Sequence, residues 1–339
     1  MLPLSQLTIS KPWVIWACSA LLEGASRQQI LQILIQNGAD ATESESLLNV
    51  AIQSPIMEAA LSGYSRARRE THRLKDQLYE IASKDVHQEF PTPEAFHNVY
   101  LAHNVPIHIP GFCANSPALK AWNTERLKLL IGDLNVEVCK GRQADKNPDR
   151  HFQKYLHTLQ MSEYIDLVEA GSGNDLYMIA RNNNFTEFCD RLWGDLIFPE
   201  HYFSTERAKK TSSFWYGPKS THTLTHHDTT NILFCQIWGQ KTFWLSPPEN
   251  ILIAAEASSY YASSQLSVLS NCAEKCSQHH IFKATLNPGD ALLIPVGWWH
   301  EVLSLSTSIS IGITGLLFEN RYVEYHPAPL ASSQSHGSE

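Results

Sequence analysis

Two short segments about seventy residues apart contain side chains suited to binding a transition metal. The first is TLTHHD at residues 223–228, and the second is IPVGWWH at residues 294–300. Residues two apart on a β-strand face the same side, so His226 and Asp228 can enter one cavity while His227 faces away. With one more imidazole from a distant strand, the set would hold a metal on one side and leave the opposite positions open, as non-haem Fe(II) requires.

The sequence around both segments predicts strands and sharp turns. The HxD triplet alone is weak evidence in a chain with 16 histidines, because short motifs often occur by chance. Residues 231–245 predict a strand, a glycine-centred turn and a second strand, which together suggest a hairpin. Residues 288–290 predict a turn, 291–294 a short buried strand, and 295–297 a bend before a strand over 306–313. Both segments therefore lie where side chains can be directed into the mouth of a barrel.

Three motifs in this region carry a resemblance to a known family. They are T-x-x-H-x-D at 223–228, Q-[IV]-x-G-x-K at 236–241 and P-G-D-x-L-x-I-P-x-G-W-W-H at 288–300. With them, the region from about Pro91 to Tyr325 resembles the JmjC/cupin-like Fe(II)- and 2-oxoglutarate-dependent oxygenases, which include the asparaginyl hydroxylase factor-inhibiting HIF. The resemblance implies a mainly β fold with flanking helices, a double-stranded β-helix or jelly roll.

The resemblance also implies roles for individual residues. His226, Asp228 and His300 would hold the iron. Lys241 falls where the family's lysine pairs with the distal carboxylate of 2-oxoglutarate, and Thr223 where a threonine hydroxyl bonds the same carboxylate. A dianion drawn into a low-dielectric barrel loses hydration, so an ammonium and hydroxyl donors must replace the lost water. Without the flanking motifs, Lys241 would be read as a solvated hairpin lysine.

Further candidate positions around the cofactor are less specific. Tyr177 lies where the family often supplies a tyrosine hydroxyl to the same carboxylate, although an aromatic residue in an apolar strand is usually core. Asn231 comes one residue earlier after Asp228 than the family's asparagine, and we expect it to support a ligand. The last core strand has Gly312 where the asparaginyl hydroxylase has asparagine. That polar contact is therefore either missing or replaced by Thr314.

Four aromatic residues are candidate walls for the substrate, although each is also what a barrel core requires. They are Trp215, Tyr216, Trp298 and Trp299.

The function implied by the resemblance is that of an Fe(II)/2-oxoglutarate dioxygenase. It would consume O₂, convert 2-oxoglutarate to succinate and hydroxylate a protein or peptide side chain. Three alternatives stay open: hydroxylation of a small metabolite or nucleoside, demethylation of an N-methyl group, and a metal-binding cupin without turnover. The complete set of ligands together with Lys241 argues against the last. Because a fold does not determine its substrate, the peptide assignment rests on the family alone.

Composition limits the class of protein. The chain has 339 residues, of which 43% are hydrophobic and 18% charged, and its formal net charge is −8. This length predicts one large domain and a smaller one.

The negative charge argues against a nucleic-acid binder, because such proteins neutralise phosphates with lysine and arginine. No run of about 18 apolar residues occurs, so we expect no membrane span, and residues 12–22 lack the cleavage site of a signal peptide. A cytoplasmic location is the expectation.

Cysteine usage fits a reducing compartment. The seven cysteines are an odd number and are scattered along the chain, which does not suggest a disulfide framework. One cluster contains four residues of types that bind zinc, at a spacing unlike that of a standard zinc knuckle. Free thiols in a loop are the favoured reading of that cluster, which consists of Cys272, Cys276, His279 and His280.

The rest of the chain predicts a helical subdomain and a tail. Residues 1–85 suggest a small bundle of three short helices, with glycines at helix ends and a capping box at Thr42 and Glu45. A longer helix from Pro55 to about Ser83 could pack within the chain or against a second subunit, so a homodimer is possible. Residues 86–325 form the expected catalytic domain. The serine- and proline-containing tail, 326–339, is expected to be disordered.

Overall fold

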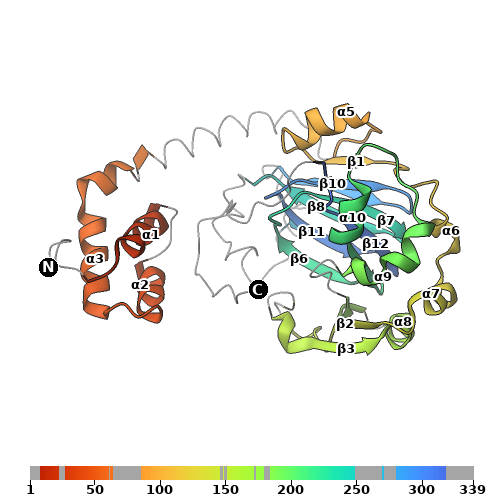
Figure 1. The fold of residues 1–339 in the computed structure, drawn as a ribbon, viewed down its shortest axis with the longest axis horizontal. Helices are drawn as coiled ribbons and strands as arrows, with labels where there is room; N and C mark the ends of the chain where they lie inside the picture. Colours follow the sequence, from red (N-terminus) through yellow and green to blue (C-terminus); the bar gives the residue numbers. More distant parts are fainter. Residues whose placement is uncertain are drawn as a thin grey trace. The chain divides into compact units, whose positions relative to one another are not determined.

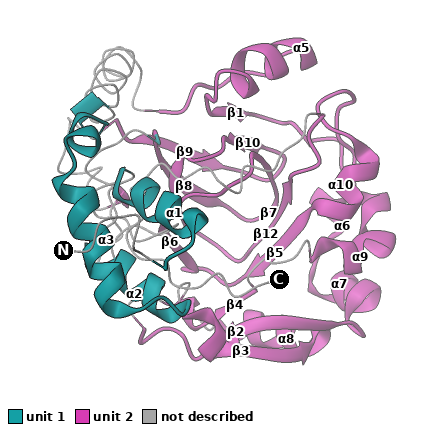
Figure 2. Ribbon diagram, turned by 60° about the vertical axis from the view of Figure 1, so that its left-hand side comes forward, with its two compact units in different colours: residues 1–82, 248–263, 326–339 teal, residues 83–247, 264–325 magenta. Residues whose placement is uncertain are grey.

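The computed structural model describes residues 8–22, 27–60, 62–63, 85–145, 148, 151–171, 173–178, 184–248, 269–270 and 280–317. It separates the chain into two compact units, shown in different colours in Figure 2. The described part of the smaller unit consists mainly of residues 8–63, and the larger unit contains almost all of the described residues from 85 to 317.

The smaller unit contains three short helices: α1 (Lys11–Leu22), α2 (Arg27–Gln36) and α3 (Ala41–Gln53). Apolar side chains from all three form one buried cluster that includes Ala17, Leu34 and Leu47. Helix α3 begins after Asp40, whose carboxylate accepts the Glu43 N–H at 2.9 Å. The capping box expected at Thr42 was therefore wrong by two residues, because the aspartate supplies the favoured N-terminal acceptor.

Several expectations concern residues that lie outside the described ones. Residues 55–60 and 62–63 are helical, whereas the remainder of the long helix expected up to Ser83 is not described. The same holds for the tail and for three members of the cysteine–histidine cluster. No helix in the described part of the chain combines the length and apolar character that crossing a bilayer needs.

Two antiparallel sheets form the larger unit, which confirms the expected jelly roll (Figure 1). From β5 to β12 the chain passes repeatedly between the two sheets, although the consecutive strands β8 and β9 pair within one sheet, so residues far apart in the chain become neighbours. The five-stranded sheet consists, in order, of β1 (Ile107–Ile109), β10 (Ala291–Ile294), β7 (Ile232–Trp238), β12 (Ser308–Ile313) and β5 (Ser213–Gly217). The four-stranded sheet consists of β6 (His222–His226), β11 (Trp299–Ser304), β8 (Lys241–Ser246) and β9 (Phe282–Leu286).

The strands on either side of Gly239 do not pair with each other. β7 belongs to the five-stranded sheet and β8 to the four-stranded one, so the predicted hairpin was wrong. Gly239 has a φ of +69°, and a Cβ atom there would overlap the carbonyl oxygen of Thr307. Glycine thus allows the chain to cross between the sheets at a point of close backbone approach.

Helices and a small third sheet complete the larger unit. The helices are α5 (Pro93–Ala95), η2 (Phe96–Leu101), α6 (Ala118–Ala121), α7 (Thr124–Ile131), α8 (Met161–Glu169), α9 (Phe185–Leu192) and α10 (Thr205–Thr211). Short 3-10 turns are η3 (Phe152–Tyr155), η4 (Gly173–Asp175) and η5 (Trp193–Asp195). The third sheet has the order β3 (Leu156–Gln160), β2 (Asn135–Lys140) and β4 (Leu176–Tyr177).

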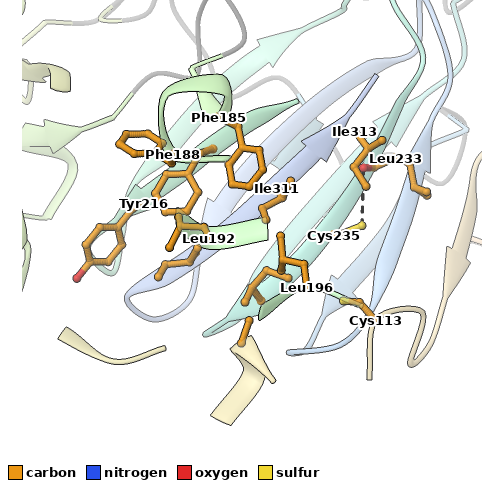
Figure 3. Packing of buried hydrophobic residues seen from close by; sticks show 14 of the residues in the cluster. Cys113, Phe185, Phe188, Leu192, Leu196, Tyr216, Leu233, Cys235, Ile311 and Ile313 are labelled. Carbon is orange, nitrogen blue, oxygen red and sulfur yellow. Dashed lines mark hydrogen bonds between the residues drawn. The ribbon is translucent and has the colours of Figure 1, made fainter. Parts of the chain in front are cut away.

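The main hydrophobic core lies between the helices and one face of the five-stranded sheet. Figure 3 shows side chains of α9, such as Phe185, near Ile311 of β12, with Cys235 of β7 farther along the same cluster. Burial of each such side chain stabilises the fold by roughly 1.5–3 kcal/mol. Because strand residues alternate between faces, the neighbours of these residues face the barrel interior instead. Phe234 and Gly312 are therefore interior positions.

Candidate metal centre

Three potential metal ligands come together at one end of the four-stranded sheet. His226 ends β6 and pairs in register with His300, the second residue of β11, and Asp228 follows β6 by two residues. One ligand atom from each lies within 4.8 Å of the others. The two imidazole centres are 4.2 Å apart, and His300 Nε2 lies 3.4 Å from an Asp228 carboxylate oxygen. The fold thus places the residues of both sequence segments around a single point.

Backbone carbonyl groups orient both imidazole rings. The Nδ1 atom of His226 lies 2.7 Å from the carbonyl oxygen of Leu224, and that of His300 lies 2.9 Å from the carbonyl oxygen of Trp298. Because a carbonyl oxygen only accepts, each Nδ1 donates its proton to that carbonyl group. Nε2 of each ring is then the atom that can bind a metal once it carries no proton. Two imidazole nitrogens and one carboxylate oxygen then face the shared point, a donor set that fits a ferrous ion.

Asp228 is ionised at neutral pH. Burial raises its pKa, but the hydrogen bond from His300 and the nearby imidazoles outweigh that effect and lower the pKa to about 2. The anionic carboxylate of Asp228 places a negative charge at the point where a divalent cation would lie. The electrostatics of the group therefore favour cation binding.

A β-bulge in β6 brings Thr223 to the same side as His226. His300 pairs with His226, but two residues later Val302 pairs with Thr223, so two residues of β6, 224 and 225, lie opposite one residue of β11. In a regular strand, residues three apart would lie on opposite faces, and the extra residue cancels that difference. The Thr223 hydroxyl also lies 3.1 Å from the hydroxyl of Tyr177. These two candidate cofactor residues are thus adjacent in the structure.

Lys241 is a buried cation on the interior face. It begins β8, pairs with Ser304 of β11, and is 3% exposed. Its Nζ atom lies 5.3 Å from the ring centre of Phe234, and no carboxylate among the described residues forms an ion pair with it. Burial lowers the pKa of Lys241 to about 7. The solvated hairpin alternative is therefore wrong, and the amine is available to an anionic ligand.

Asn231 and Thr314 have other partners than a cofactor. The side-chain oxygen of Asn231 accepts the Val296 N–H at 2.8 Å. This bond ties the segment after Asp228 to the bend before His300, so Asn231 supports the ligands through the backbone. Thr314 lies beyond the end of β12 and donates its hydroxyl to the carbonyl oxygen of Thr211 at 2.7 Å. Thr314 as a replacement for the family's asparagine was thus a wrong expectation, because its hydroxyl is used in joining two backbone segments.

The ring of Trp215 fills the space beside Gly312. A Cβ atom at position 312 would come within 2.5 Å of the Trp215 Cζ3 atom. The Trp215 ring also packs on Phe234, with 5.2 Å between ring centres. An aromatic side chain thus occupies the volume that a larger residue would need at this point of the last core strand.

Changing Gly312 to alanine is expected to destabilise the protein by about 1–3 kcal/mol, because an added methyl group must displace a packed ring. Denaturant unfolding of the variant measures the change. Gly194→Ala is the matched control, since a Cβ atom there has no neighbour within 4 Å. Equal stability of the two variants would mean that the interior relaxes around the new methyl group at little cost.

Two of the four aromatic candidates for substrate walls face away from the interior. Tyr216 is fully buried on the helix-covered face of β5, where its ring lies 5.8 Å from that of Tyr164. Trp299 is also fully buried and packs on His227, on the face of β11 opposite His300. Both assignments were wrong, because adjacent strand residues point to opposite faces.

The remaining two aromatic candidates have different surroundings. Trp215 lies on the interior face of β5, where it contacts Phe234. Trp298 precedes β11, packs on Phe282 with 5.8 Å between ring centres, and donates its indole N–H to the Asn104 carbonyl oxygen at 2.8 Å. Trp298 is 1% exposed, so in this structure its ring is part of the packing beside His300.

Sequence reasoning missed two buried charged residues near the site. Glu301 follows His300 directly and is fully buried. Arg142 is also fully buried, with its guanidinium group 4.9 Å from the ring centre of Tyr177. Glu301 could have been found from the sequence, because a glutamate directly after a predicted metal ligand is a candidate for a buried partner. Arg142 lies more than eighty residues before the HxD motif, and nothing in its local sequence marks it.

Comparison with known proteins gives one matching family and several relatives. The family model described as a cupin-like domain matches residues 93–313. Lysine-specific demethylase 8 of Xenopus tropicalis is 27% identical over 229 residues, which cover 65% of this chain and 50% of the relative. Lysine-specific demethylase JMJ30 of Arabidopsis thaliana is 27% identical over 229 residues, covering 64% of this chain and 51% of the relative.

A shorter relative is matched over most of its own length. The human bifunctional peptidase and (3S)-lysyl hydroxylase JMJD7 is 23% identical over 253 residues, covering 65% of this chain and 80% of the relative. By contrast, the chain spans only about half the length of the two demethylases. The matched family region includes both ligand-bearing segments and Lys241.

Proposed function

This chain belongs to the JmjC/cupin-like family, and from that premise we propose that it is an Fe(II)- and 2-oxoglutarate-dependent oxygenase that hydroxylates a protein or peptide side chain. The observation that carries the proposal is the meeting of His226, Asp228 and His300 around one point, on the same interior surface as the buried amine of Lys241. The first group suits a ferrous ion and the second a carboxylate.

The chain's own residues would hold and orient the reactants. The Nε2 atoms of His226 and His300 and the carboxylate of Asp228 would hold the iron, with the rings fixed by backbone carbonyl groups. Bound iron with 2-oxoglutarate and O₂ supplies the oxidation, in which the oxo acid is decarboxylated to succinate and an oxygen atom is inserted into a substrate C–H bond. Lys241 and Thr223 would bind the distal carboxylate.

Tyr177 would be the third group on that carboxylate, beside Thr223. Its hydroxyl lies 3.1 Å from the Thr223 hydroxyl, and its ring packs against the buried guanidinium of Arg142. A dianion so bound exchanges its hydration for one ammonium and two hydroxyl donors, which offsets the cost of desolvation. The same contacts fix the direction from which the oxo acid approaches the iron.

The relatives support a protein substrate and leave two reactions open. Their names describe lysine-specific demethylases and a lysyl hydroxylase. Both reactions begin with oxidation of a C–H bond next to or within a lysine side chain, so the same iron site serves either. Hydroxylation is our first proposal, N-methyl demethylation the second. A small metabolite or nucleoside substrate and a cupin without turnover are the remaining alternatives.

Mass spectrometry of reaction products tests the proposal. The protein with Fe(II), 2-oxoglutarate and O₂ is incubated with peptides that contain lysine or methyl-lysine. Hydroxylation adds about 16 Da to an unmodified peptide, whereas demethylation removes about 14 Da and releases formaldehyde. These values follow from the atoms gained and lost in the oxygen insertion that the cofactors perform. His300→Ala is the control for background oxidation. Absence of succinate under all conditions would favour the cupin without turnover.

Raising the pH above 7 is expected to weaken 2-oxoglutarate binding. Burial lowers the pKa of Lys241 to about 7, so above this pH the free protein holds a neutral amine that must take up a proton to pair with a carboxylate. The apparent Kd then rises by up to about tenfold per pH unit, and below pH 7 this contribution is constant. Calorimetric titration of the Co(II)-loaded protein in buffers of different ionisation enthalpy measures both the Kd and the proton uptake.

Lys241→Met is the control for this pH dependence. It keeps nearly the length of the side chain and removes the titrating amine, so the slope above pH 7 is expected to disappear. A slope that persists in this variant would assign the pH dependence to another group.

A further inference from the structure

A buried carboxylate lies behind the candidate iron site, on the outer face of the sheet. Glu301 points away from the interior face that His300 occupies, and it is 0% exposed. Its oxygens accept hydrogen bonds from His222 Nε2 at 2.8 Å, Thr225 Oγ1 at 2.6 Å and Ser270 Oγ at 2.6 Å. Backbone N–H groups of residues 269 and 270 add two longer bonds. A carboxylate with this many donors is held firmly in one position.

One of these donors precedes the β6 bulge and the other lies within it. His222 comes one residue before Thr223, and Thr225 lies between Thr223 and His226, so Glu301 binds both the start of the strand and its bulge. A regular strand would not place side chains three residues apart on the same face. The bulge lets both contact one carboxylate on the outer face, while Thr223 and His226 share the inner one.

The backbone of His222 is fixed as well. Its N–H donates to the side-chain oxygen of Asn174 at 2.9 Å, and its carbonyl oxygen accepts from Arg142 at 2.9 Å. His222, the residue before the bulged segment, is therefore fixed by hydrogen bonds of its side chain, its N–H and its carbonyl group. Within the bulge lies Leu224, whose carbonyl oxygen accepts the Nδ1 proton of His226.

We infer that Glu301 is a positioning residue for the iron site, acting through the β6 bulge. It holds His222 and Thr225, these hold the bulge, and the bulge sets the Leu224 carbonyl group that orients His226. The same bulge directs Thr223 to the interior. This inference rests on the proposed function, since its consequence is a correctly oriented ligand. Outer partners that orient metal ligands typically change metal affinity by 10–100-fold when removed.

Thr225→Val is the most direct test, because it replaces one hydroxyl with a methyl group of similar size. Titration of the metal-free protein with Co(II), followed by its visible absorption, measures the dissociation constant without turnover. We expect the Kd to rise by about tenfold in Thr225→Val and to stay at the wild-type value in Thr225→Ser, which keeps the hydroxyl.

Thr242→Val is the matched control. Thr242 is a buried threonine on the same outer face, and its hydroxyl lies 3.0 Å from that of Thr285, away from β6. This variant loses a buried hydroxyl contact in the same sheet, so a general weakening of the sheet would affect it equally. We expect its Co(II) affinity to match the wild type. Equal losses in Thr225→Val and Thr242→Val would overturn the inference.

Glu301→Gln extends the test to the carboxylate itself. The glutamine amide has the same shape, but its NH₂ group cannot accept the hydrogen bonds that one carboxylate oxygen accepts. We expect about 10–100-fold weaker Co(II) binding. Thermal unfolding of the metal-free protein shows whether this variant folds; if it does not, Thr225→Val decides. Wild-type Co(II) affinity in Thr225→Val would refute the positioning role alone. A wild-type protein that binds no Co(II) would refute the proposed function, and this inference with it.

Discussion

His226→Ala is expected to abolish conversion of 2-oxoglutarate to succinate while the protein stays folded. The variant removes one of three candidate ligands, and the two that remain offer too few donors to keep a ferrous ion in place. Removal of a partner behind a ligand already costs about 10–100-fold in affinity or activity, so loss of the ligand itself should exceed about 100-fold. The measurement is succinate formation without added substrate, which depends only on the iron site and the oxo acid.

The design includes a second ligand and a matched histidine. Asp228→Ala should give the same loss through the carboxylate. His157→Ala removes an exposed imidazole from β3 and should leave turnover unchanged, which controls for loss of histidine as such. Circular dichroism shows that the three variants keep their fold. Unaltered turnover in either ligand variant would remove that residue from the iron site.

The part of the site that sequence could predict is the part governed by strand alternation. His226 and Asp228, two residues apart, come together in space, and His227 faces away and packs on Trp299. His300 was predicted as a ligand from the family motifs, because no local pattern connects it to His226. The pairing of β6 with β11 brings these residues together, and the strand order responsible for it is a property of the whole jelly roll.

Alternation also explains where the sequence reasoning failed. It would place Thr223 and His226 on opposite faces, and only the bulge, which depends on partners from other segments, reverses this. The four aromatic candidates are two pairs of adjacent residues, Trp215 with Tyr216 and Trp298 with Trp299. Alternation predicts that only one residue of each pair points into the barrel interior, yet all four were taken as substrate walls. Tyr216 and Trp299 are the members that face away.

The turn at Gly239 shows a second limit of local reasoning. A strand, a glycine and another strand look the same in sequence whether the chain turns back within one sheet or crosses to another. The difference arises because β7 pairs with β10 and β12, whereas β8 pairs with β11 and β9. These partners lie far away in the chain, so their pairing energy is invisible in a short window.

Lys241→Met is expected to weaken 2-oxoglutarate binding by roughly 2–5 kcal/mol, because the distal carboxylate would stay desolvated without its cation. That range corresponds to at least about 25-fold in Kd. Methionine has nearly the length of lysine, so the interior beside Phe234 stays filled. Co(II) affinity should be unchanged, since Lys241 is not one of the three candidate metal ligands.

Lys283→Ala provides the matched control for this last variant. Lys283 lies on β9 of the same sheet, is exposed, and places its amine 5.9 Å from the ring centre of Trp244. Its loss removes one positive charge from the sheet without changing the interior, so a long-range charge effect would appear in both variants. If Lys241→Met lowered Co(II) and 2-oxoglutarate affinity equally, the interior would have collapsed. If it lowered neither, the carboxylate must bind elsewhere, and the buried amine would need another role.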